Sequence, residues 1–245
     1  MHRFFVAAEA LRDDNIPLTE EILRHMSVLR LAPGADILLL DGTGNVCHCR
    51  IDQLDRKGGS VVVLSRSEQR ETAFPIELMQ ALPKADKMDL VLQKGTELGV
   101  TRFTPLQTSR SVPRLTPQRE EQRRQRWLRI IREAARQSRR PLLPELGEIR
   151  TLEKALENCQ SALRLMLWEE GSQPLETILP ERTPAGATLL IGPEGGFSEQ
   201  EAAAARRRGF IPVLFGPRIL RSETAGFAAA TILQYRYGDL GGEHG

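Results

Sequence analysis

The pattern of hydrophobic and polar positions changes once along the chain, near residue 72. Before that point the apolar runs are short, and they end in turn sequences rich in glycine and asparagine, at residues 41–45 and 56–59. We expect strands over residues 4–6, 35–41, 47–54 and 60–66. A short helix is expected to begin after Thr19, whose hydroxyl suits an N-cap. Short strands at this spacing predict a compact β-barrel in residues 1–72.

After residue 73, strand patterns alternate with helical ones. Strands are expected over residues 76–82, 102–108, 163–168, 188–192 and 212–215. The longest helix between them is predicted from Pro117 to Ser138, and the last helix ends at Tyr237. This alternation is typical of a parallel α/β sheet with helices on both faces. The polar segment 67–74 is expected to be the linker, which gives a first domain of residues 1–72 and a second of residues 73–245.

Charge is distributed unevenly along the chain. The net charge is +2, but residues 102–140 contain twelve arginines and only three acidic residues. Guanidinium groups bind phosphate through two parallel hydrogen bonds and stack on bases. The local excess therefore favours a nucleic acid as partner, although a solvated helix face would show the same composition.

Composition disfavours several classes of protein. No apolar stretch approaches the ~20 residues that span a bilayer, and acidic residues occur too early for a secretory signal. We therefore expect a cytoplasmic protein with no membrane contact. Three cysteines do not make a disulfide framework, and Cys47 and Cys49, with His48 on the opposite face of the strand, do not supply a zinc site. The four histidines lie outside the α/β pattern, which argues against a Ser-His-Asp hydrolase.

Two loops of the second domain follow the carboxyl ends of predicted strands, where open α/β sheets bind ligands. They are IGPEGGFS at residues 191–198 and FGPRILRSETA at residues 215–225. Glycine lets a backbone approach a ligand closely and adopt positive φ. Neither loop has the spacing of a phosphate loop or of a dinucleotide turn. Ser198 and Glu201 are spaced as a capping box, and a tight strand-to-helix turn would explain either loop alone.

Taken together with QKGTELGV (93–100) and REAARQSRR (132–140), the two loops resemble the RsmE family of ribosomal RNA methyltransferases, which belongs to the SPOUT superfamily. The four motifs match in order and spacing, and the resemblance covers essentially the whole chain. Arg136 and Arg139 depart from it, because they stand where more neutral or acidic and glycine-like residues are expected. The resemblance implies an α/β methyltransferase domain with a C-terminal trefoil knot and an N-terminal PUA-like barrel that binds RNA.

The resemblance also implies a cofactor and a reaction. S-adenosylmethionine would bind in the knot, mainly through backbone groups, and its methyl group would go to N3 of a uridine in 16S ribosomal RNA, with no metal. The residues matched to the cofactor are Leu190, Gly192, Gly195, Gly196, Leu214, Gly216, Ile219, Leu220 and Thr224. Glu194 is a candidate base, and Arg218 or Arg221 would stabilise negative charge on the uracil oxygens. A carboxylate near a helix N-terminus is also favoured without any catalysis.

Two other functions stay open. One is a SPOUT enzyme that acts on another RNA position, such as a ribose 2′-hydroxyl or a guanine nitrogen. The other is a non-catalytic RNA-binding factor for ribosome assembly, which would explain the barrel and the arginines but not the two loops.

The resemblance implies a homodimer, and the last helix, residues 222–237, is apolar around most of its circumference. Burial of that helix inside the knot of its own chain would produce the same pattern.

Overall fold

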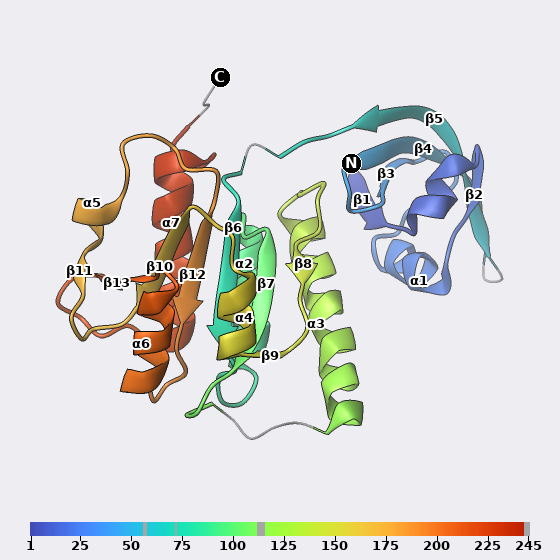
Figure 1. Cartoon of the computed structure of the whole chain (residues 1–245). Helices are drawn as coiled ribbons and strands as arrows, with labels where there is room; N and C mark the ends of the chain where they lie inside the picture. Colours follow the sequence, from blue (N-terminus) through green and yellow to red (C-terminus); the bar gives the residue numbers. More distant parts are fainter. Residues whose placement is uncertain (56–57, 72, 112–115, 243–245) are drawn as a thin grey trace. The chain divides into compact units, whose positions relative to one another are not determined.

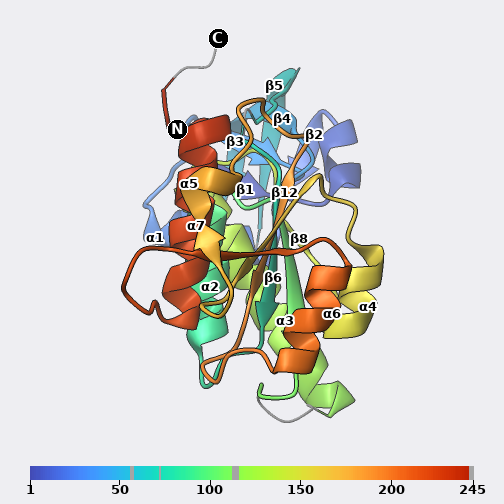
Figure 2. The ribbon, with the colours of Figure 1, turned by 60° about the vertical axis from the view of Figure 1, so that its left-hand side comes forward.

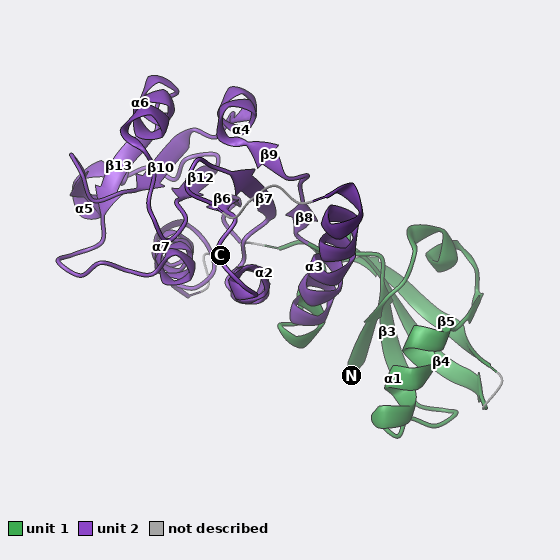
Figure 3. Cartoon of the chain, turned by 90° about the horizontal axis from the view of Figure 1, so that it is seen from below, with its two compact units in different colours: residues 1–71, 135–143 green, residues 72–134, 144–245 purple. Residues whose placement is uncertain are grey.

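The structure is a computed structural model that describes the chain except residues 56–57, 72, 112–115 and 243–245 (Figure 1). The chain folds into two compact units, coloured separately in Figure 3. Unit 1 contains residues 1–71 and 135–143, and unit 2 contains residues 72–134 and 144–245.

Unit 1 is built on one five-stranded sheet. Its elements are β1 (His2–Phe5), the 3-10 helix η1 (Ala8–Arg12), β2 (Asn15–Pro17), α1 (Glu20–Val28), β3 (Asp36–Leu40), β4 (Asn45–Leu54) and β5 (Gly59–Glu68). The strand order is β1-β3-β4-β5-β2, with β1 parallel to β3 and the other pairs antiparallel. The four predicted strands are confirmed, whereas β2 and η1 were missed because both are too short to show a period. Closure of this sheet into a barrel stays a prediction.

Local signals in unit 1 behave as the sequence predicts. The Thr19 hydroxyl accepts a hydrogen bond from the Ile22 amide and caps α1. Asp41 accepts bonds from the Thr43 and Asn45 amides and closes the first turn. Of the second turn, residues 56–57 lie outside the described residues.

Cysteines 47 and 49 face the apolar core of unit 1, as the strand period predicts. Both are buried in β4 beside Ile37 and Leu39, and burial raises the pKa of the Cys49 thiol to about 11. They therefore act as core side chains rather than as reactive thiols.

Residues 135–143 depart from the expected division of the chain. Ala135 is buried with Phe5 and Leu40 of the first sheet, and the Leu143 amide donates to the Gly42 carbonyl. Contacts between such distant segments leave no periodic signal, which explains why the sequence placed residues 135–143 in the second domain.

Other contacts also hold residues 135–143 against the rest of unit 1. The Arg140 guanidinium pairs with the Glu71 carboxylate at 2.7 Å, with both side chains nearly buried. Arg139, at the position where the family pattern expects a glycine-like residue, has a φ of 63°.

The expected linker is anchored at its carboxyl end. Phe74 is buried in unit 2, where its amide and carbonyl groups both bond to the side chain of Gln234. Gln234 lies too far along the sequence for this anchor to be expected from the chain alone.

Unit 2 is built on a parallel sheet. Its first elements are β6 (Ile76–Ala81), α2 (Lys87–Glu97), β7 (Arg102–Gln107), α3 (Pro117–Gln137), β8 (Glu145–Leu146), β9 (Arg150–Thr151) and α4 (Leu152–Asn158). Then follow β10 (Leu163–Leu167), β11 (Gln173–Pro174), α5 (Leu175–Ile178), β12 (Ala187–Ile191), α6 (Glu199–Arg207), β13 (Ile211–Leu214) and α7 (Ser222–Tyr237). The order is β11-β13-β10-β12-β6-β7-β8, with β9 also on β7, and every pair is parallel. The predicted parallel α/β sheet is confirmed.

Helices cover both faces of this sheet. In Figure 2, α2 and α7 lie on one side of β6 and β12, while α4 and α6 lie on the other. The second pair packs on the strands through one apolar cluster that includes Leu156, Ala202 and Ala205. Because β12 and β13 flank β10 and run in the same direction, the loops that follow them emerge at one edge of the sheet.

Candidate functional site

The two glycine loops line one cavity of about 750 Å³ at that edge. Ten of the twelve residues that the sequence assigned to the site contribute to its wall: Gly192, Glu194, Gly195, Gly196, Leu214, Gly216, Arg218, Ile219, Leu220 and Arg221. Motifs separated in sequence by α6 and β13 are thus brought to a single concave surface of unit 2.

Leu190 and Thr224 lie outside the wall of this cavity. Leu190 is fully buried in β12, in the apolar cluster that also contains Met166 and Phe197. Thr224 is exposed in the first turn of α7. Leu190 therefore supports the loop from the core side of the sheet.

The glycines of the first loop are needed for different reasons. Gly196 has a φ of 69°, a conformation that side chains rarely adopt, and open space lies where its Cβ would be. Gly195 has no such φ, so the positive φ that glycine permits is used at Gly196 and not at Gly195. A Cβ on Gly195 would lie 3.4 Å from the Arg110 side chain, and one on Gly192 would lie 3.2 Å from the Phe197 ring. In the second loop Gly216, with a φ of 72°, repeats the arrangement of Gly196.

The capping box at the start of α6 is confirmed, and it also binds a third loop. The Ser198 hydroxyl accepts from the Glu201 amide at 3.2 Å, while the Glu201 carboxylate accepts from the Ser198 amide at 2.9 Å. The same carboxylate accepts from the Ser109 amide at 2.7 Å and from the Ser109 hydroxyl at 3.0 Å. Burial alone would raise the pKa of Glu201, but these hydrogen bonds hold that pKa below its usual value.

Lys87, at the start of α2, joins both glycine loops. Its ammonium lies 3.0 Å from a carboxylate oxygen of Glu194 in the first loop and 3.4 Å from one of Glu223 in the first turn of α7. Glu194 also accepts a bond from the Lys84 amide at 3.1 Å. Burial alone would raise the pKa of Glu194, but backbone hydrogen bonds and Lys87 outweigh it and hold the pKa low. Glu194 is therefore an ionised group whose oxygens are already engaged.

A second set of hydrogen bonds, through Ser222 at the start of α7, also connects the two loops. The Ser222 hydroxyl donates to the Gly192 carbonyl at 2.5 Å and accepts from the buried amide of Gln80 at 2.8 Å. Gln80 lies near the carboxyl end of β6, so a core strand fixes the distance between the two loops.

The sequence missed several residues of the cavity wall, above all Lys87 and Arg110. The guanidinium of Arg110 donates through one nitrogen to the carbonyl oxygens of Gly195, at 2.7 Å, and Phe197, at 3.3 Å. Both residues follow the carboxyl ends of β6 and β7, which share an edge with β12 and β13 in a parallel sheet. That placement was the signal that could have found them.

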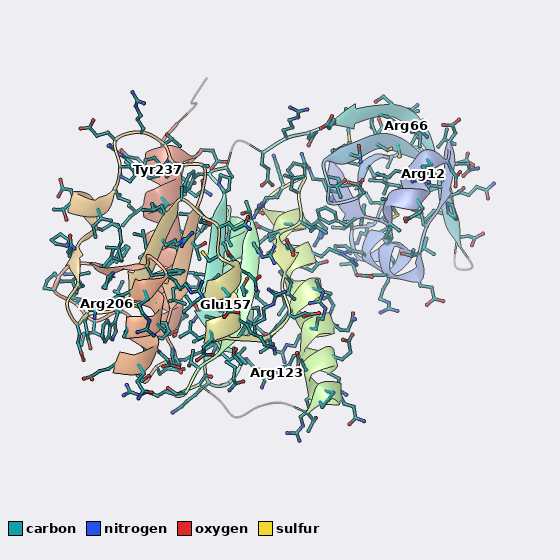
Figure 4. The ribbon with its side chains drawn as sticks, in the orientation of Figure 1. Arg12, Arg66, Arg123, Glu157, Arg206 and Tyr237 are labelled. Carbon is teal, nitrogen blue, oxygen red and sulfur yellow. The ribbon has the colours of Figure 1, made fainter. Side chains whose placement is uncertain are left out.

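The loop after β10 forms a further part of the wall, with Trp168, Glu169 and Glu170. The guanidinium carbon of Arg206, labelled on α6 in Figure 4, lies 4.9 Å from the centroid of the Trp168 ring, and Arg206 also donates to the Glu170 carbonyl. Arg206 thus fixes this loop against α6.

Comparison with known proteins places the two units in one family. A model of the RNA methyltransferase domain matches residues 70–234, and a model of the RNA methyltransferase PUA domain matches residues 18–64. The ribosomal RNA small subunit methyltransferase E of Bacillus subtilis is 31% identical over 96% of this chain and 97% of its own length. The chain belongs to the RsmE family. The Synechocystis member is 35% identical over 91% of this chain and 74% of its own length.

Solved structures agree with this assignment. The ribosomal RNA small subunit methyltransferase E of Neisseria gonorrhoeae, bound to S-adenosyl methionine, has a TM-score of 0.89 at 32% identity and covers 98% of this chain and 99% of its own. A protein of Legionella pneumophila, in complex with the cofactor SAM, has a TM-score of 0.89 at 33% identity over 97% of this chain and 98% of its own. The parallel sheet of unit 2 is therefore the SPOUT methyltransferase core, and unit 1 contains the PUA-like domain.

Two further findings concern the described part of this RsmE-family chain. No helix there is both long and apolar enough to cross a membrane. No group of three or more His, Cys, Asp or Glu side chains is arranged there to hold a metal ion.

Proposed function

We propose that this protein transfers a methyl group from S-adenosylmethionine to N3 of a uridine in 16S ribosomal RNA. The single observation that carries the proposal is the cavity that both glycine loops line. The relatives from Neisseria and Legionella bind S-adenosylmethionine with the same overall fold, which supports an enzyme rather than a non-catalytic assembly factor.

The cavity fits this cofactor in size and in chemistry. Its volume of about 750 Å³ lies within the range of small-molecule sites, roughly 300 to 1,000 Å³. Gly196 and Gly216 expose backbone beside open space, as a ligand held by main-chain groups requires. Leu214, Ile219 and Leu220 offer apolar surface for an adenine ring. When bound, the cofactor supplies an electrophilic methyl group on a sulfonium.

The charged residues of the wall divide into two roles. Arg218 and Arg221 lie on the exposed second loop, where a uracil ring or its phosphate can reach them. Glu194 was a candidate base, but its oxygens accept from Lys84 and Lys87 and its pKa is lowered. A weaker base with occupied oxygens is better suited to holding the loop in place, and we assign Glu194 that role.

Partners follow from the same family assignment. Ribosomal RNA is the substrate. We propose that the protein recognises it within the small ribosomal subunit, in the cytoplasm, and that unit 1 binds the RNA. We also propose a homodimer that uses α7. Both cofactor loops connect to α7 through Ser222 and Glu223, so a partner on that helix would lie beside the site.

Nucleoside mass spectrometry tests the reaction. Small ribosomal subunits from cells that lack this gene should gain one 3-methyluridine per subunit when incubated with the protein and S-adenosylmethionine. A 2′-O-methyl or methylguanine product would instead establish a SPOUT enzyme with another target. Calorimetry that detects no binding of S-adenosylmethionine would contradict the cofactor site itself.

A further inference from the structure

The reaction at N3 of uracil poses a problem of charge. This nitrogen lies between two carbonyl groups and keeps its proton at neutral pH, so it becomes a nucleophile only after that proton leaves. Negative charge then spreads over the ring nitrogen and the two carbonyl oxygens. An enzyme can promote this either with a well-placed base or with fixed positive charge beside the oxygens.

The most enclosed carboxylates beside the cavity both lie against the Lys87 ammonium. Glu194 bonds to the Lys84 amide and the Lys87 ammonium, and its pKa is held low. Glu223 is buried in α7, and one of its oxygens lies 3.4 Å from the same ammonium but accepts no hydrogen bond. These pairings favour stabilisation of the anion by positive charge over proton removal by a strong base.

Among the described residues, four cationic side chains line the cavity, and they differ in how well they could stabilise such an anion. They are Lys87, Arg110, Arg218 and Arg221. Lys87 is offset by two carboxylates. Arg110, Arg218 and Arg221 are all exposed. Arg110 is fixed, because its side chain packs against Gly195 and one of its nitrogens donates to two loop carbonyls.

The bonds that fix Arg110 leave its charge available. Both partners are neutral carbonyl oxygens, of Gly195 and Phe197, rather than carboxylates. A guanidinium has five N–H groups, so the bonds through one terminal nitrogen leave the remaining N–H groups for a ligand. Arg110 thus combines a fixed position, available charge and a place in the cavity wall, which is the arrangement that electrostatic catalysis needs.

We propose that Arg110 is a catalytic residue that donates hydrogen bonds to a carbonyl oxygen of the target uracil and stabilises its anion. The N3 proton passes to water. The electron pair left on N3 forms the bond to the methyl carbon, and the pair of the broken carbon–sulfur bond stays on sulfur, which becomes a neutral thioether. This inference rests on the proposed function, since it assumes that uracil N3 is the nucleophile.

The pH dependence of the single-turnover rate tests the proposal. Small subunits from cells that lack this gene serve as substrate for the full-length protein and for Arg110→Met and Arg110→Lys. Near neutral pH, Arg110→Met should be slower than wild type by about 10²- to 10³-fold, with Arg110→Lys in between. As pH rises from about 7 to about 9, more uracil ionises without help, so the deficit should shrink by about tenfold or more. Arg207→Met, which removes an exposed arginine of α6, should match wild type at every pH.

Calorimetry with S-adenosylmethionine separates this role from a structural one. Each Arg110 variant should keep a dissociation constant within about threefold of wild type. A deficit that is constant across the pH range, or a loss of cofactor binding in both Arg110 variants, would show that Arg110 only holds the glycine loop and would overturn the proposal. If wild type forms no 3-methyluridine, the proposed function fails. If it forms 3-methyluridine while the variant deficit stays constant, only the role of Arg110 fails.

Discussion

Gly196 is the residue of the first loop whose backbone most restricts substitution. Its φ of 69° disfavours any side chain, and a β-branched one most of all. Gly195 lacks a positive φ, and a Cβ there would instead contact the Arg110 side chain at 3.4 Å. Replacement of either glycine should disturb the site, but only replacement of Gly196 should change the backbone path.

We therefore expect Gly196→Val to weaken S-adenosylmethionine binding by about 10- to 100-fold while the protein stays folded. The strain of a side chain at positive φ, of order 1–3 kcal/mol, would be relieved by moving the loop that lines the cavity. Calorimetry gives the affinity, and circular dichroism checks the fold. Gly34→Val is the matched control, because Gly34 has a φ of 88° in open space within unit 1. Equal affinities for wild type and Gly196→Val would show that this loop does not hold the cofactor.

At the scale of elements, the Glu201 carboxylate connects α6 with the loop after β7. Its pKa is lowered in the folded protein, so its contribution to stability is fully present above the usual glutamate range. That contribution is lost as pH falls through the lowered pKa, because protonation removes the charge that accepts bonds from Ser198 and Ser109.

The stability difference between wild type and Glu201→Gln should follow this sign. It should be largest near neutral pH and shrink as pH falls below the usual glutamate range, as measured by urea unfolding at several pH values. Glutamine can retain part of the capping box but offers one acceptor oxygen and no charge. Glu199→Gln, in the same first turn, is the control and should show a small difference at every pH. A Glu201→Gln difference that grows on acidification would contradict this role of the carboxylate.

The arginines of α3 do not form one uniform surface. The Arg124 guanidinium donates to the Leu146 carbonyl, and that of Arg126 pairs with Asp86 and Asp89. Arg129 and Arg132 are exposed, at a spacing of three that places them on one side of the helix. The buried face is an apolar stripe of Trp127, Ile131, Ala134 and Ala135, with Ile130 half-buried.

Only the exposed subset should bind phosphate. Alanine at Arg129 and Arg132 should reduce the log–log salt slope of RNA binding by roughly 0.7 to 0.9 per lost contact, without changing cofactor affinity. Arg124→Ala should leave the slope nearly unchanged, because that guanidinium already bonds within unit 2. Binding isotherms at several salt concentrations measure the slope. A slope unaffected by the double substitution would make this face of α3 a solvated surface with no role in RNA binding.

Helices and strands with a clear hydrophobic period were predictable from sequence. Very short strands, and contacts between residues far apart in sequence, were not. The long helix α3 and the strands β6, β10 and β12 follow from hydrophobic periodicity. The three-residue strand β2 and the two-residue strands β8, β9 and β11 contain too few residues to show one. The cavity wall could be predicted where a motif marked it. Lys87 and Arg110 also follow the carboxyl ends of strands, but no glycine motif singled them out.

For the whole molecule, the two units are not consecutive pieces of chain. The backbone passes from one unit to the other near residue 72, again after Ala134, and again after Leu143. A fragment of residues 73–245 would keep both cofactor loops but would leave Ala135 and Arg140 without Phe5 and Glu71. Unit 1 is therefore better studied by substitution within the full chain than by removal at residue 72.

The exposed side of α7 is the surface that a second copy would cover. On the sheet side, Ala229, Ala230 and Leu233 are buried, as the sequence predicts for this apolar helix. The other side keeps Ile232 and Tyr235 exposed, at 37% and 66%. Ile232 also lines a second cavity of about 620 Å³ together with Leu214 and Gly216 of the second cofactor loop and with Arg236. Burial inside its own chain thus accounts for only part of the apolar circumference of α7.

We expect the protein to be a homodimer in which Ile232 is buried against the partner, and Ile232→Arg to dissociate it. Burial of the arginine in the interface would remove its charge from water with no opposite charge beside it, which costs more free energy than most interfaces can offset. Because the same surface adjoins Leu214 and Gly216, the monomeric variant should also bind S-adenosylmethionine more weakly. Val28→Arg is the control, since Val28 is 77% exposed on α1 and should stay dimeric. Analytical ultracentrifugation measures both variants, and a wild-type species of 27.4 kDa that still methylates ribosomal RNA would rule the dimer out.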